Sequence, residues 1–535
     1  MAAKVRTIRR RARTPRERRF RIWIWPSLAI ALSLVLWLPF LDLPMISDEG
    51  GYAYVTSRWL AGEGRLYHDL WVSRPQGIFA VYALILEALG DDVVAFRLGA
   101  WIAAAATLIL VWRMARAWAG TTVALVAVFL FALLCGSPAF EGFTANAEVF
   151  MALPAAGAVW LLWRAATTGW RQWPLLAAGV CIGLATLLKP SGIVMIGVGL
   201  ALIWLLESRN RTVLQRAGWL LAGFGLALLP ALAHGWWIGW DAYLYAAVTY
   251  RLTSQSSATA GLHHQLLALL ALLMRCWPLL VVTALVLGIA RGRAWRFTAW
   301  QDAVQRELAR AGRVGIVARV AVMRGEADTA TLLLRLWLLA SFAGVAMGGD
   351  WWPHYLIQAL APFSLWLAPY LVAAWSRLAG WRRWGLAAAI VVAVLSPYSV
   401  LARGDDASIS RAIFGQDRYP DQAVIADYLR QHAPEDASIF VGFDNPAIYY
   451  LADRRAAYRY MYDAELQAIP GSYGALLDLI ESSDRPRYIV GTKERAPYPD
   501  HGQAFWEAVI RHYHIVDHIR GIPILREDDG LGRGR

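Results

Sequence analysis

Residues 45–52 read Met-Ile-Ser-Asp-Glu-Gly-Gly-Tyr and follow directly after the first long apolar run of the chain. Two further polar segments come soon afterwards, Gly-Arg-Leu-Tyr-His-Asp at 64–69 and Ser-Arg-Pro-Gln-Gly at 73–77. Ionisable groups held against a membrane are costly, so such a cluster is a candidate functional site. The alternative is structural: Ser47 or Asp48 would simply cap a short helix, because acids are favoured in a first helical turn.

The composition is that of a polytopic membrane protein. Of the 535 residues, 58% are hydrophobic and 17% are charged, whereas soluble proteins average about 45–50% apolar and about 25% charged residues. A net charge of +13 would suggest nucleic acid binding in a soluble protein. Here the basic residues recur between apolar runs, so we interpret them as orientation signals and expect no nucleic acid partner. The three cysteines lie within apolar runs and show neither metal-ligand spacing nor a disulfide framework.

Residues 1–21 form a dense basic arm that includes Arg-Arg-Arg-Ala-Arg at 9–13. Nucleic acid binding is one explanation, but we favour a cytoplasmic orientation signal before the first span. That span is expected at 22–43, long enough for a hydrocarbon core of about 30 Å at about 1.5 Å per residue. It is too long for a signal-peptide core and lacks a small-residue cleavage site, so we expect it to be retained. The cluster at 45–77 then faces outward.

The rest of residues 22–401 alternates long apolar runs with basic loops. Further spans are expected near 94–112, 120–135, 148–163, 174–189, 192–206, 214–233, 265–289, 331–348, 355–374 and 384–401, which makes about eleven in all. The run 77–89 is short for a span and is expected to be an interfacial or re-entrant helix. Every internal basic cluster then falls on the cytoplasmic side, as the positive-inside rule requires. The segment 291–330 is expected to be a cytoplasmic loop with a short amphipathic helix.

The composition changes after about residue 402, where charges become frequent and the apolar runs shorten. We expect helices near 421–431, 445–451, 473–482 and 502–512, and strands at 438–441, 458–460, 487–491 and 522–525. This alternation indicates a small α/β domain at 402–535. By the number of spans it lies outside, in the periplasm or its equivalent, while the N-terminus is cytoplasmic.

The cluster after the first span resembles the first external loop of the C-type (GT-C) membrane glycosyltransferases. The resemblance rests on Asp48-Glu49, Tyr52, the turn from Gly62 to Gly64, and Arg74-Pro75. The similar families are the protein-O-mannosyltransferases, the aminoarabinose transferases and the lipopolysaccharide-core glycosyltransferases. The resemblance implies a transmembrane GT-C module at 22–401, with a catalytic first external loop at 44–93.

Three later segments extend the resemblance. They are the lysine hairpin Leu188-Lys189-Pro190-Ser191-Gly192, the segment Asn146-Ala147-Glu148, and Pro353-His354-Tyr355 before a late span. Each also has a structural explanation: Lys189 would snorkel to the interface from a helix end, and Tyr355 would join an aromatic belt with Trp351 and Trp352. The chain departs from these families at Gly51, where some relatives have a basic residue, and at Arg74, where many have lysine.

The resemblance implies an inverting glycosyltransferase that takes its sugar from a polyprenyl-phosphate donor at the outer face of the membrane. Transfer needs a base for the acceptor hydroxyl and cations for the departing lipid phosphate. No general acid is needed, because the second pKa of a phosphate is about 6. We assign Asp48 as the base, with Glu49 orienting either the acceptor or the Asp48 loop. The expected phosphate ligands are Arg74 and Lys189, with His354 and Tyr355 as secondary donors, and Tyr52, Asp69 and Glu148 are expected to contact substrate.

This chemistry requires no cofactor, and the acceptor is a lipid, a glycan or a protein. A divalent metal held by Asp48, Asp69 and His68 is an alternative that we do not favour, because carboxylates so close in sequence more often do other work. A transporter or flippase for a lipid-linked sugar or small solute would use the same charges as a path, although no inverted repeat is evident. A non-catalytic assembly protein would leave the Asp48 cluster unexplained. We therefore expect a glycosyltransferase of the bacterial inner membrane, in contact with membrane lipids.

Overall fold

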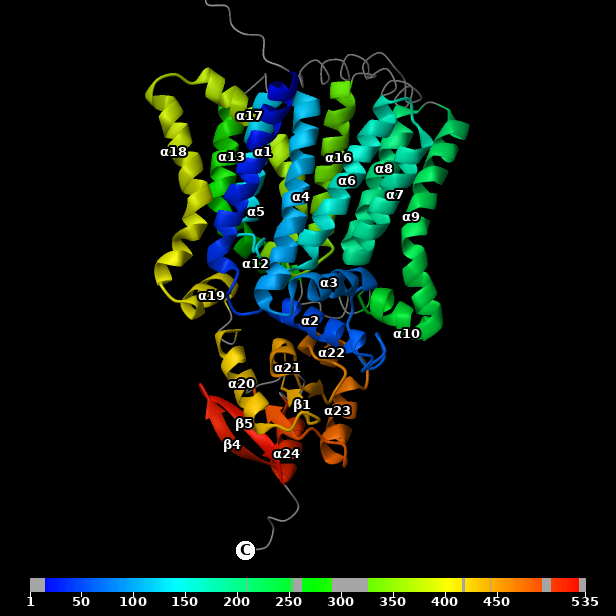
Figure 1. The fold of residues 1–535 in the computed structure, drawn as a ribbon, viewed down its shortest axis with the longest axis vertical. Helices are drawn as coiled ribbons and strands as arrows, with labels where there is room; N and C mark the ends of the chain where they lie inside the picture. The colour runs from blue at the N-terminus through cyan, green and yellow to red at the C-terminus, as the bar shows by residue number, and fades with distance from the viewer. Residues whose placement is uncertain are drawn as a thin grey trace, which may run out of the picture.

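A computed structural model describes residues 15–207, 209–251, 253, 262–290, 326–415, 419–442, 444–492 and 502–528 of the chain. It has two parts, a bundle of long helices and a smaller domain that contains a β-sheet and covers one end of the bundle (Figure 1). The bundle helices are α1 (Pro15–Trp37), α4 (Val93–Ala119), α5 (Thr121–Cys135), α6 (Ala147–Thr167), α7 (Gln172–Leu188), α8 (Val194–Leu206), α9 (Asn210–Ile238), α12 (Leu262–Arg275), α13 (Trp277–Ala290), α16 (Glu326–Ala346), α17 (Ile357–Arg377) and α18 (Trp381–Leu395). Short 3-10 turns extend some of them: η1 (Leu38–Phe40), η2 (Pro190–Ile193), η4 (Pro353–Leu356) and η5 (Ser396–Arg403).

Seven of the described helices are long and apolar enough to cross a membrane, or eight if α12 and α13, which are bent by 68° relative to each other, form one broken span. The expected number of about eleven exceeds this count because three expected spans are shorter helices, at Thr121–Cys135, Gln172–Leu188 and Pro190–Leu206. These helices nevertheless lie within the same bundle (Figure 1). Leucines point outward along α9, where Leu214 is 72% exposed. Such a surface is stable only against lipid, so the chain is a multi-pass membrane protein.

Two helices lie across the end of the bundle that faces the smaller domain (Figure 1): α2 (Ser47–Leu60) and α3 (Gln76–Leu89). Beside them the chain continues from α9 into α10 (Trp240–Leu244) and the π-helical turn η3 (Tyr245–Thr249). Helix α3 was expected to be an interfacial or re-entrant helix rather than a span, and its orientation across the bundle fits that expectation. The segment 44–93 is therefore largely helical, and it forms a platform between the two parts of the molecule.

The C-terminal domain contains a five-stranded mixed sheet in the order β2-β1-β3-β5-β4. Strand β1 (Ser438–Val441) pairs in parallel with β2 (Arg455–Ala456) and β3 (Tyr488–Val490), whereas β5 (Ile522–Glu527) is antiparallel to β3 and to β4 (Tyr513–Ile519). The domain's helices are α19 (Asp406–Phe414), α20 (Gln422–His432), α21 (Ala447–Ala452), α22 (Asp463–Ala468), α23 (Ser472–Glu481) and α24 (Gln503–His512), with the 3-10 turn η6 (Tyr419–Asp421). The sheet confirms the expected C-terminal α/β domain.

Some local predictions were wrong. The strand expected at 458–460 is instead a two-residue strand at Arg455–Ala456, and α22 and β4 were not predicted. Strand β4 was not predicted because it lies at the sheet edge and most of its side chains are exposed. Its sequence therefore lacks the apolar alternation of a half-buried strand. Most of the expected loop 291–330 lies outside the described residues, and 326–330 belong to α16.

The C-terminal domain docks on α2 through two adjacent glycines. A Cβ atom on Gly50 would clash with the backbone of Ala447, and one on Gly51 would clash with the hydroxyl group of Tyr462. A hydrogen bond stabilises the same contact: the Tyr54 hydroxyl accepts from the Ala456 N–H at 2.7 Å. The absence of side chains at Gly50 and Gly51 therefore lets α2 and the C-terminal domain pack in direct contact.

Candidate active site

A cavity of about 930 Å³ lies between the platform, the end of the bundle and the C-terminal domain. Helix α2 contributes Asp48 and Tyr52, the loop before α3 contributes Arg74, and η4 contributes His354 and Tyr355. Five of the nine expected site residues therefore share one cavity, although they are up to 307 positions apart in sequence. Its volume falls near the upper end of the range of about 300–1,000 Å³ typical of small-molecule sites.

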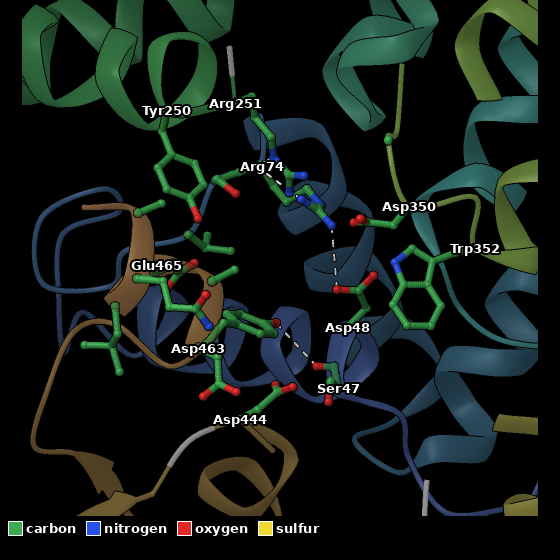
Figure 2. Close-up of a pocket in the computed structure, with 18 of the residues that line it drawn as sticks. Ser47, Asp48, Arg74, Tyr250, Arg251, Asp350, Trp352, Asp444, Asp463 and Glu465 are labelled. Atoms are coloured by element: carbon green, nitrogen blue, oxygen red, sulfur yellow. Dashed lines mark hydrogen bonds and ion pairs between the residues drawn. The ribbon is translucent and has the colours of Figure 1, made fainter. Parts of the chain in front are cut away.

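Asp48 stands in the first turn of α2, and its side chain points toward that of Arg74 in the cavity (Figure 2). Its Oδ1 lies 3.6 Å from Nη2 of Arg74, and the Asp48 side chain remains 28% exposed. Nε of Arg74 donates to the Tyr52 hydroxyl at 2.8 Å, and the backbone carbonyl of Arg74 accepts from the Tyr67 hydroxyl at 2.8 Å. Asp48 is thus a carboxylate that is held in place yet accessible, as a base that meets a substrate must be.

A second arginine joins Arg74 on this wall of the cavity, as Figure 2 shows. Nε of Arg251 donates to the carbonyl oxygen of Ser73 at 3.1 Å, and Nη1 of Arg74 donates to the same oxygen at 3.3 Å. Two guanidinium groups that share one acceptor form a strongly positive wall suited to an anion. Arg251 lies in the polar segment 234–264 and was not among the expected site residues, because no motif distinguishes it from the other polar residues of that segment.

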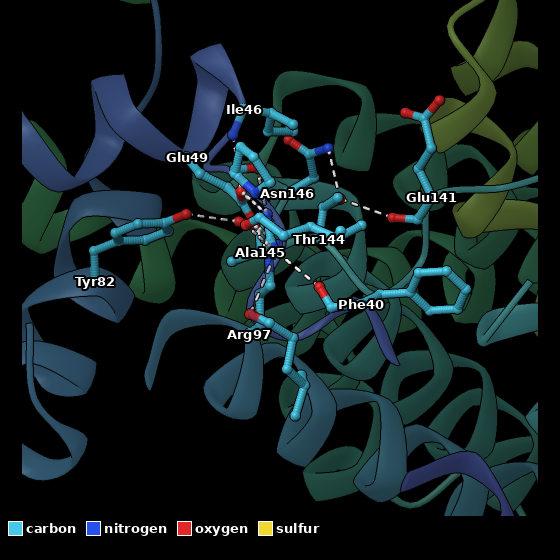
Figure 3. Close-up of polar contacts among 12 residues, drawn as sticks. Phe40, Ile46, Glu49, Tyr82, Arg97, Glu141, Thr144, Ala145 and Asn146 are labelled. Carbon is cyan, nitrogen blue, oxygen red and sulfur yellow. Dashed lines mark hydrogen bonds and ion pairs between the residues drawn. The ribbon is translucent and has the colours of Figure 1, made fainter. Parts of the chain in front are cut away.

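Glu49 has a different environment from Asp48 (Figure 3). Its side chain is fully buried and does not line the cavity. Both of its carboxylate oxygens bind Arg97 of α4, at 3.0 Å and 2.8 Å, and they also accept from the N–H groups of Ile46 and Ala145. Of the two roles expected for Glu49, the structure leaves no access for orienting the acceptor, whereas its contacts suit orienting the Asp48 loop.

Arg97 is the centre of this buried network, and it was not predicted from the sequence. Besides Glu49, it donates to the carbonyl oxygens of Phe40, Leu43 and Pro44, at 2.8, 2.8 and 3.1 Å. These carbonyls belong to the last residue of η1 and to the non-helical segment that follows it, where no intrahelical N–H group satisfies them. Arg97 therefore fixes the chain that leads directly into Asp48.

Two other expected residues, Glu148 and Lys189, belong to a polar network behind the cavity. Glu148, the first acid of α6, forms an ion pair with Lys189, and neither residue lines the cavity. Lys189 lies over the ring of Tyr355, with Nζ 3.7 Å from its centroid, and Nδ1 of His354 lies 3.1 Å from Oε2 of Glu141. Lys189 and Glu148 thus support Tyr355 and His354, which reach the cavity themselves.

Asp69 and His68 lie apart from the cavity. Asp69 is exposed and forms an ion pair with Arg65 at 3.2 Å, while Nε2 of His68 lies 2.8 Å from the Ile238 carbonyl oxygen. Neither residue lines the cavity that contains Asp48. Among the described residues, no group of three or more histidine, cysteine, aspartate or glutamate side chains is arranged to hold a metal ion.

The C-terminal domain supplies the remaining wall of the cavity, which the sequence had not indicated. Tyr419, Asp444, Tyr462, Asp463 and Glu465 all line it. The Tyr462 hydroxyl donates to the Ser47 carbonyl oxygen at 3.3 Å, immediately before Asp48. Gly51 makes this approach feasible, because any larger residue would occupy the space of the Tyr462 hydroxyl. Gly51, where the chain departs from the similar families, therefore packs against Tyr462, which lies 411 positions later.

Comparisons with known proteins agree with this architecture. Residues 73–237 match the sequence profile of the family described as dolichyl-phosphate-mannose-protein mannosyltransferase. No curated protein sequence matches the chain. The crystal structure of ArnT from Cupriavidus metallidurans bound to undecaprenyl phosphate superposes with a TM-score of 0.60 at 16% identity, covering 95% of this chain and 99% of ArnT.

A second solved structure shares the fold over most of the chain. It is the oligosaccharyltransferase AglB from Archaeoglobus fulgidus in complex with an inhibitory peptide and a dolichol-phosphate, with a TM-score of 0.51 and 14% identity, covering 88% of this chain and 69% of AglB. At these identities the similarity establishes the fold. The chain is thus a multi-pass membrane protein with the GT-C glycosyltransferase fold, and its residues 73–237 carry the sequence profile of the dolichyl-phosphate-mannose-protein mannosyltransferase family.

Proposed function

We propose that this protein is an inverting glycosyltransferase that moves a sugar from a polyprenyl phosphate to a hydroxyl group of a lipid, glycan or protein. The observation that carries the proposal is the pairing of an accessible carboxylate, Asp48, with Arg74 in a cavity at the end of the bundle. The apolar tail of such a donor would pack against the apolar surface of the helices, while its phosphate and sugar would reach this polar cavity. The ligands named for the two similar structures, undecaprenyl phosphate and a dolichol-phosphate, support a donor of this chemical class.

Arg74 and Arg251 are the proposed phosphate ligands, because both guanidinium groups line the cavity and converge on the Ser73 carbonyl. Tyr355 and His354 also line it and serve as secondary donors. Lys189 was expected to bind phosphate itself, but its pairing with Glu148 favours an indirect role in which it holds the Tyr355 ring. The bound phosphate would bring the anomeric carbon of the sugar close to Asp48.

In the proposed reaction, Asp48 accepts the proton of the acceptor hydroxyl as its oxygen forms a bond to the anomeric carbon. The bond from that carbon to the phosphate oxygen breaks, and the electron pair leaves with the phosphate, whose charge the arginines stabilise. One displacement at carbon inverts the anomeric configuration. The residues of this site supply the base and the cations, so we propose a reaction without a cofactor.

We also propose that the cavity and the C-terminal domain face the outer side of a bacterial inner membrane, with the N-terminus in the cytoplasm. Arg113 and Arg116 lie in the C-terminal part of α4, at the end of the bundle opposite the C-terminal domain. Exposed Trp236 and Trp237 lie near the end of α9 that approaches the cavity. Basic residues at one end of the bundle and aromatic residues at the other support this orientation.

The test is transfer of labelled sugar from polyprenyl phosphates to a lipid, glycan or peptide extract by the protein purified in lipid. Asp48→Asn keeps the size of the side chain but removes the base, and Asp42→Asn is a matched control at an exposed acid six positions earlier. The proposal expects a new glycosidic bond with the wild type and with Asp42→Asn. Movement of the lipid-linked sugar across the membrane without a new bond would overturn it in favour of a carrier.

A further inference from the structure

The two walls of the cavity differ in their charged groups. Both lining arginines lie on one wall, together with carboxylates such as Asp48 and Asp350, whereas the described residues of the other wall include acids but no arginine or lysine. Arg74 and Arg251 belong to the wall built by the platform and the bundle, as Figure 2 shows. Asp444, Asp463 and Glu465 line the wall built by the C-terminal domain. An anionic phosphate is attracted by the two arginines of the first wall, and the carboxyl groups of the second wall offer it no such attraction. The donor phosphate therefore leaves the C-terminal wall available for a different group.

The C-terminal wall is held rigidly against α2. The Tyr462 hydroxyl donates to the Ser47 carbonyl at 3.3 Å, and the Tyr419 hydroxyl donates to Ser47 Oγ at 3.4 Å. Burial raises the pKa of Tyr419 to about 12, so its hydroxyl group stays protonated at neutral pH. Because Ser47 directly precedes Asp48, a ligand bound to this wall would lie next to the proposed base.

Glu465 is the most unusual residue of this wall. Its side chain is only 3% exposed, it lines the cavity, and its Oε2 has no hydrogen-bond partner within the part of the chain that the structure describes. Burial raises the pKa of Glu465 well above its usual range, although the N–H groups of Tyr462 and Met461 and the charge of Arg74 act in the opposite direction. A buried carboxyl oxygen without a partner is costly unless a ligand supplies one.

We propose that the C-terminal wall is the acceptor subsite and that it takes a polyhydroxylated acceptor, the sugar ring of a glycan or glycolipid, with Glu465 hydrogen-bonded to one of its hydroxyl groups. This inference rests on the proposed transferase function and names its acceptor class. Because burial favours the protonated form of Glu465, its carboxyl group can both donate hydrogen bonds to hydroxyl groups and accept them. The flanking rings of Tyr419 and Tyr462 offer flat apolar faces next to these polar groups.

The experiment compares two acceptor probes that share one alkyl chain, an alkyl glycoside and the corresponding alkanol, with a serine-containing peptide as a third. The wild type is expected to use the glycoside with a kcat/KM at least about tenfold above that of the alkanol, because a site that binds hydroxyls rejects an analogue without them. Glu465→Leu is expected to raise the KM for the glycoside about tenfold with little change in kcat. Glu465→Gln keeps the hydrogen bonding and is expected to stay within about threefold of the wild type.

Two controls separate recognition from misfolding. Glu435→Leu replaces an exposed glutamate in a turn of the same domain and is expected to change nothing. Binding of polyprenyl phosphate, measured by quenching of tryptophan fluorescence, is expected to be the same in all variants, because Trp352 lines the donor side of the cavity. If Glu465→Leu has lost this binding, it has misfolded. Glu465→Gln then tests the inference in its place, and it is expected to keep the wild-type preference for the glycoside.

The inference is overturned if the wild type prefers the alkanol or the peptide, or if Glu465→Leu leaves the KM for the glycoside unchanged while donor binding is intact. A loss in Glu465→Gln as large as in Glu465→Leu would also overturn it, since a required charge indicates recognition of a cationic group. These outcomes differ from failure of the proposed function. In that case the wild type transfers sugar to none of the three probes, nor to a lipid or glycan extract.

Discussion

Arg74 and Arg251 donate to the same carbonyl oxygen, that of Ser73, at 3.3 Å and 3.1 Å. The two residues are 177 positions apart, and both line the cavity that contains Asp48. Guanidinium groups repel each other, so this convergence has an electrostatic cost that a bound anion would offset. The pair is therefore the strongest structural reason to place the donor phosphate on this wall.

We expect Arg251→Ala to raise the KM for the polyprenyl-phosphate sugar about 10- to 100-fold, because a hydrogen bond to a charged group contributes about 1.5–3 kcal/mol. Arg251→Lys keeps the charge but not the forked geometry, so it should recover only part of this loss. Steady-state kinetics over a range of donor concentrations measures the effect. Arg65→Ala, at an exposed arginine outside the cavity, serves as the control. An unchanged KM in Arg251→Ala would remove Arg251 from the donor site.

The buried pair of Arg97 and Glu49 predicts a strong effect on stability. Arg97→Met leaves the buried Glu49 carboxylate without its partner, which should cost about 3–5 kcal/mol and lower the Tm in detergent. The double variant Arg97→Met with Glu49→Leu removes both charges and should recover part of the loss. If the double variant is no more stable than Arg97→Met alone, the hydrogen bonds of Arg97 to the backbone carbonyls matter more than the ion pair.

Gly51 and Tyr462 predict a rescue between distant positions. Gly51→Ala should lower both the Tm and the transfer rate, because the new Cβ would meet the Tyr462 hydroxyl. Tyr462→Phe removes that hydroxyl, so the double variant should recover part of the stability that Gly51→Ala loses. If the decrease in Tm of the double variant equals the sum of the decreases in the two single variants, these residues do not interact.

Glu465 predicts how stability depends on pH. Burial raises its pKa in the folded protein, so the folded state holds a proton at pH values where the unfolded chain, with a pKa of about 4.3, has released it. This contribution to stability is fully present below the unfolded pKa and is lost as pH rises toward the folded pKa, by at most about 1.4 kcal/mol per pH unit. The groups that act on it are Tyr462, Met461, Arg74 and Asp444.

Glu465→Gln cannot ionise, so its stability relative to the wild type should increase as the pH is raised from 5 to 8. The measurement is the Tm of both proteins across this range, in one lipid or detergent. A Tm difference that stays constant with pH would mean that the Glu465 carboxyl group titrates at its ordinary value in the folded protein.

Much of the fold was predictable because apolar runs and the alternation of helices and strands are local signals. The bundle helices and the C-terminal α/β domain lie close to where the sequence indicated. The number of full-length spans was overestimated, because apolar runs such as 121–135 and 172–188 form helices in the bundle that are shorter than a typical span. The polar edge strand β4 gave no periodic signal at all.

The site was predictable in part. Motif residues such as Asp48, Arg74 and His354 do line one cavity, whereas Asp69, from the same loop, points elsewhere. Arg97 lies inside an apolar run and looks like an isolated charge, and its role depends on carbonyl groups more than 50 positions earlier. Glu465 lies in a domain whose docking on Gly50 and Gly51 no local pattern reveals. What the sequence could not supply was the tertiary contact between distant segments.

The most direct test of the account is the rate of sugar transfer by Asp48→Asn, with Asp42→Asn as the control and polyprenyl-phosphate binding as the check on folding. We predict that transfer falls by about 10²–10⁴-fold, the usual contribution of a general base, while donor binding and the Tm stay close to those of the wild type. Transfer by Asp48→Asn at the rate of the wild type would contradict the assignment of Asp48 as the base.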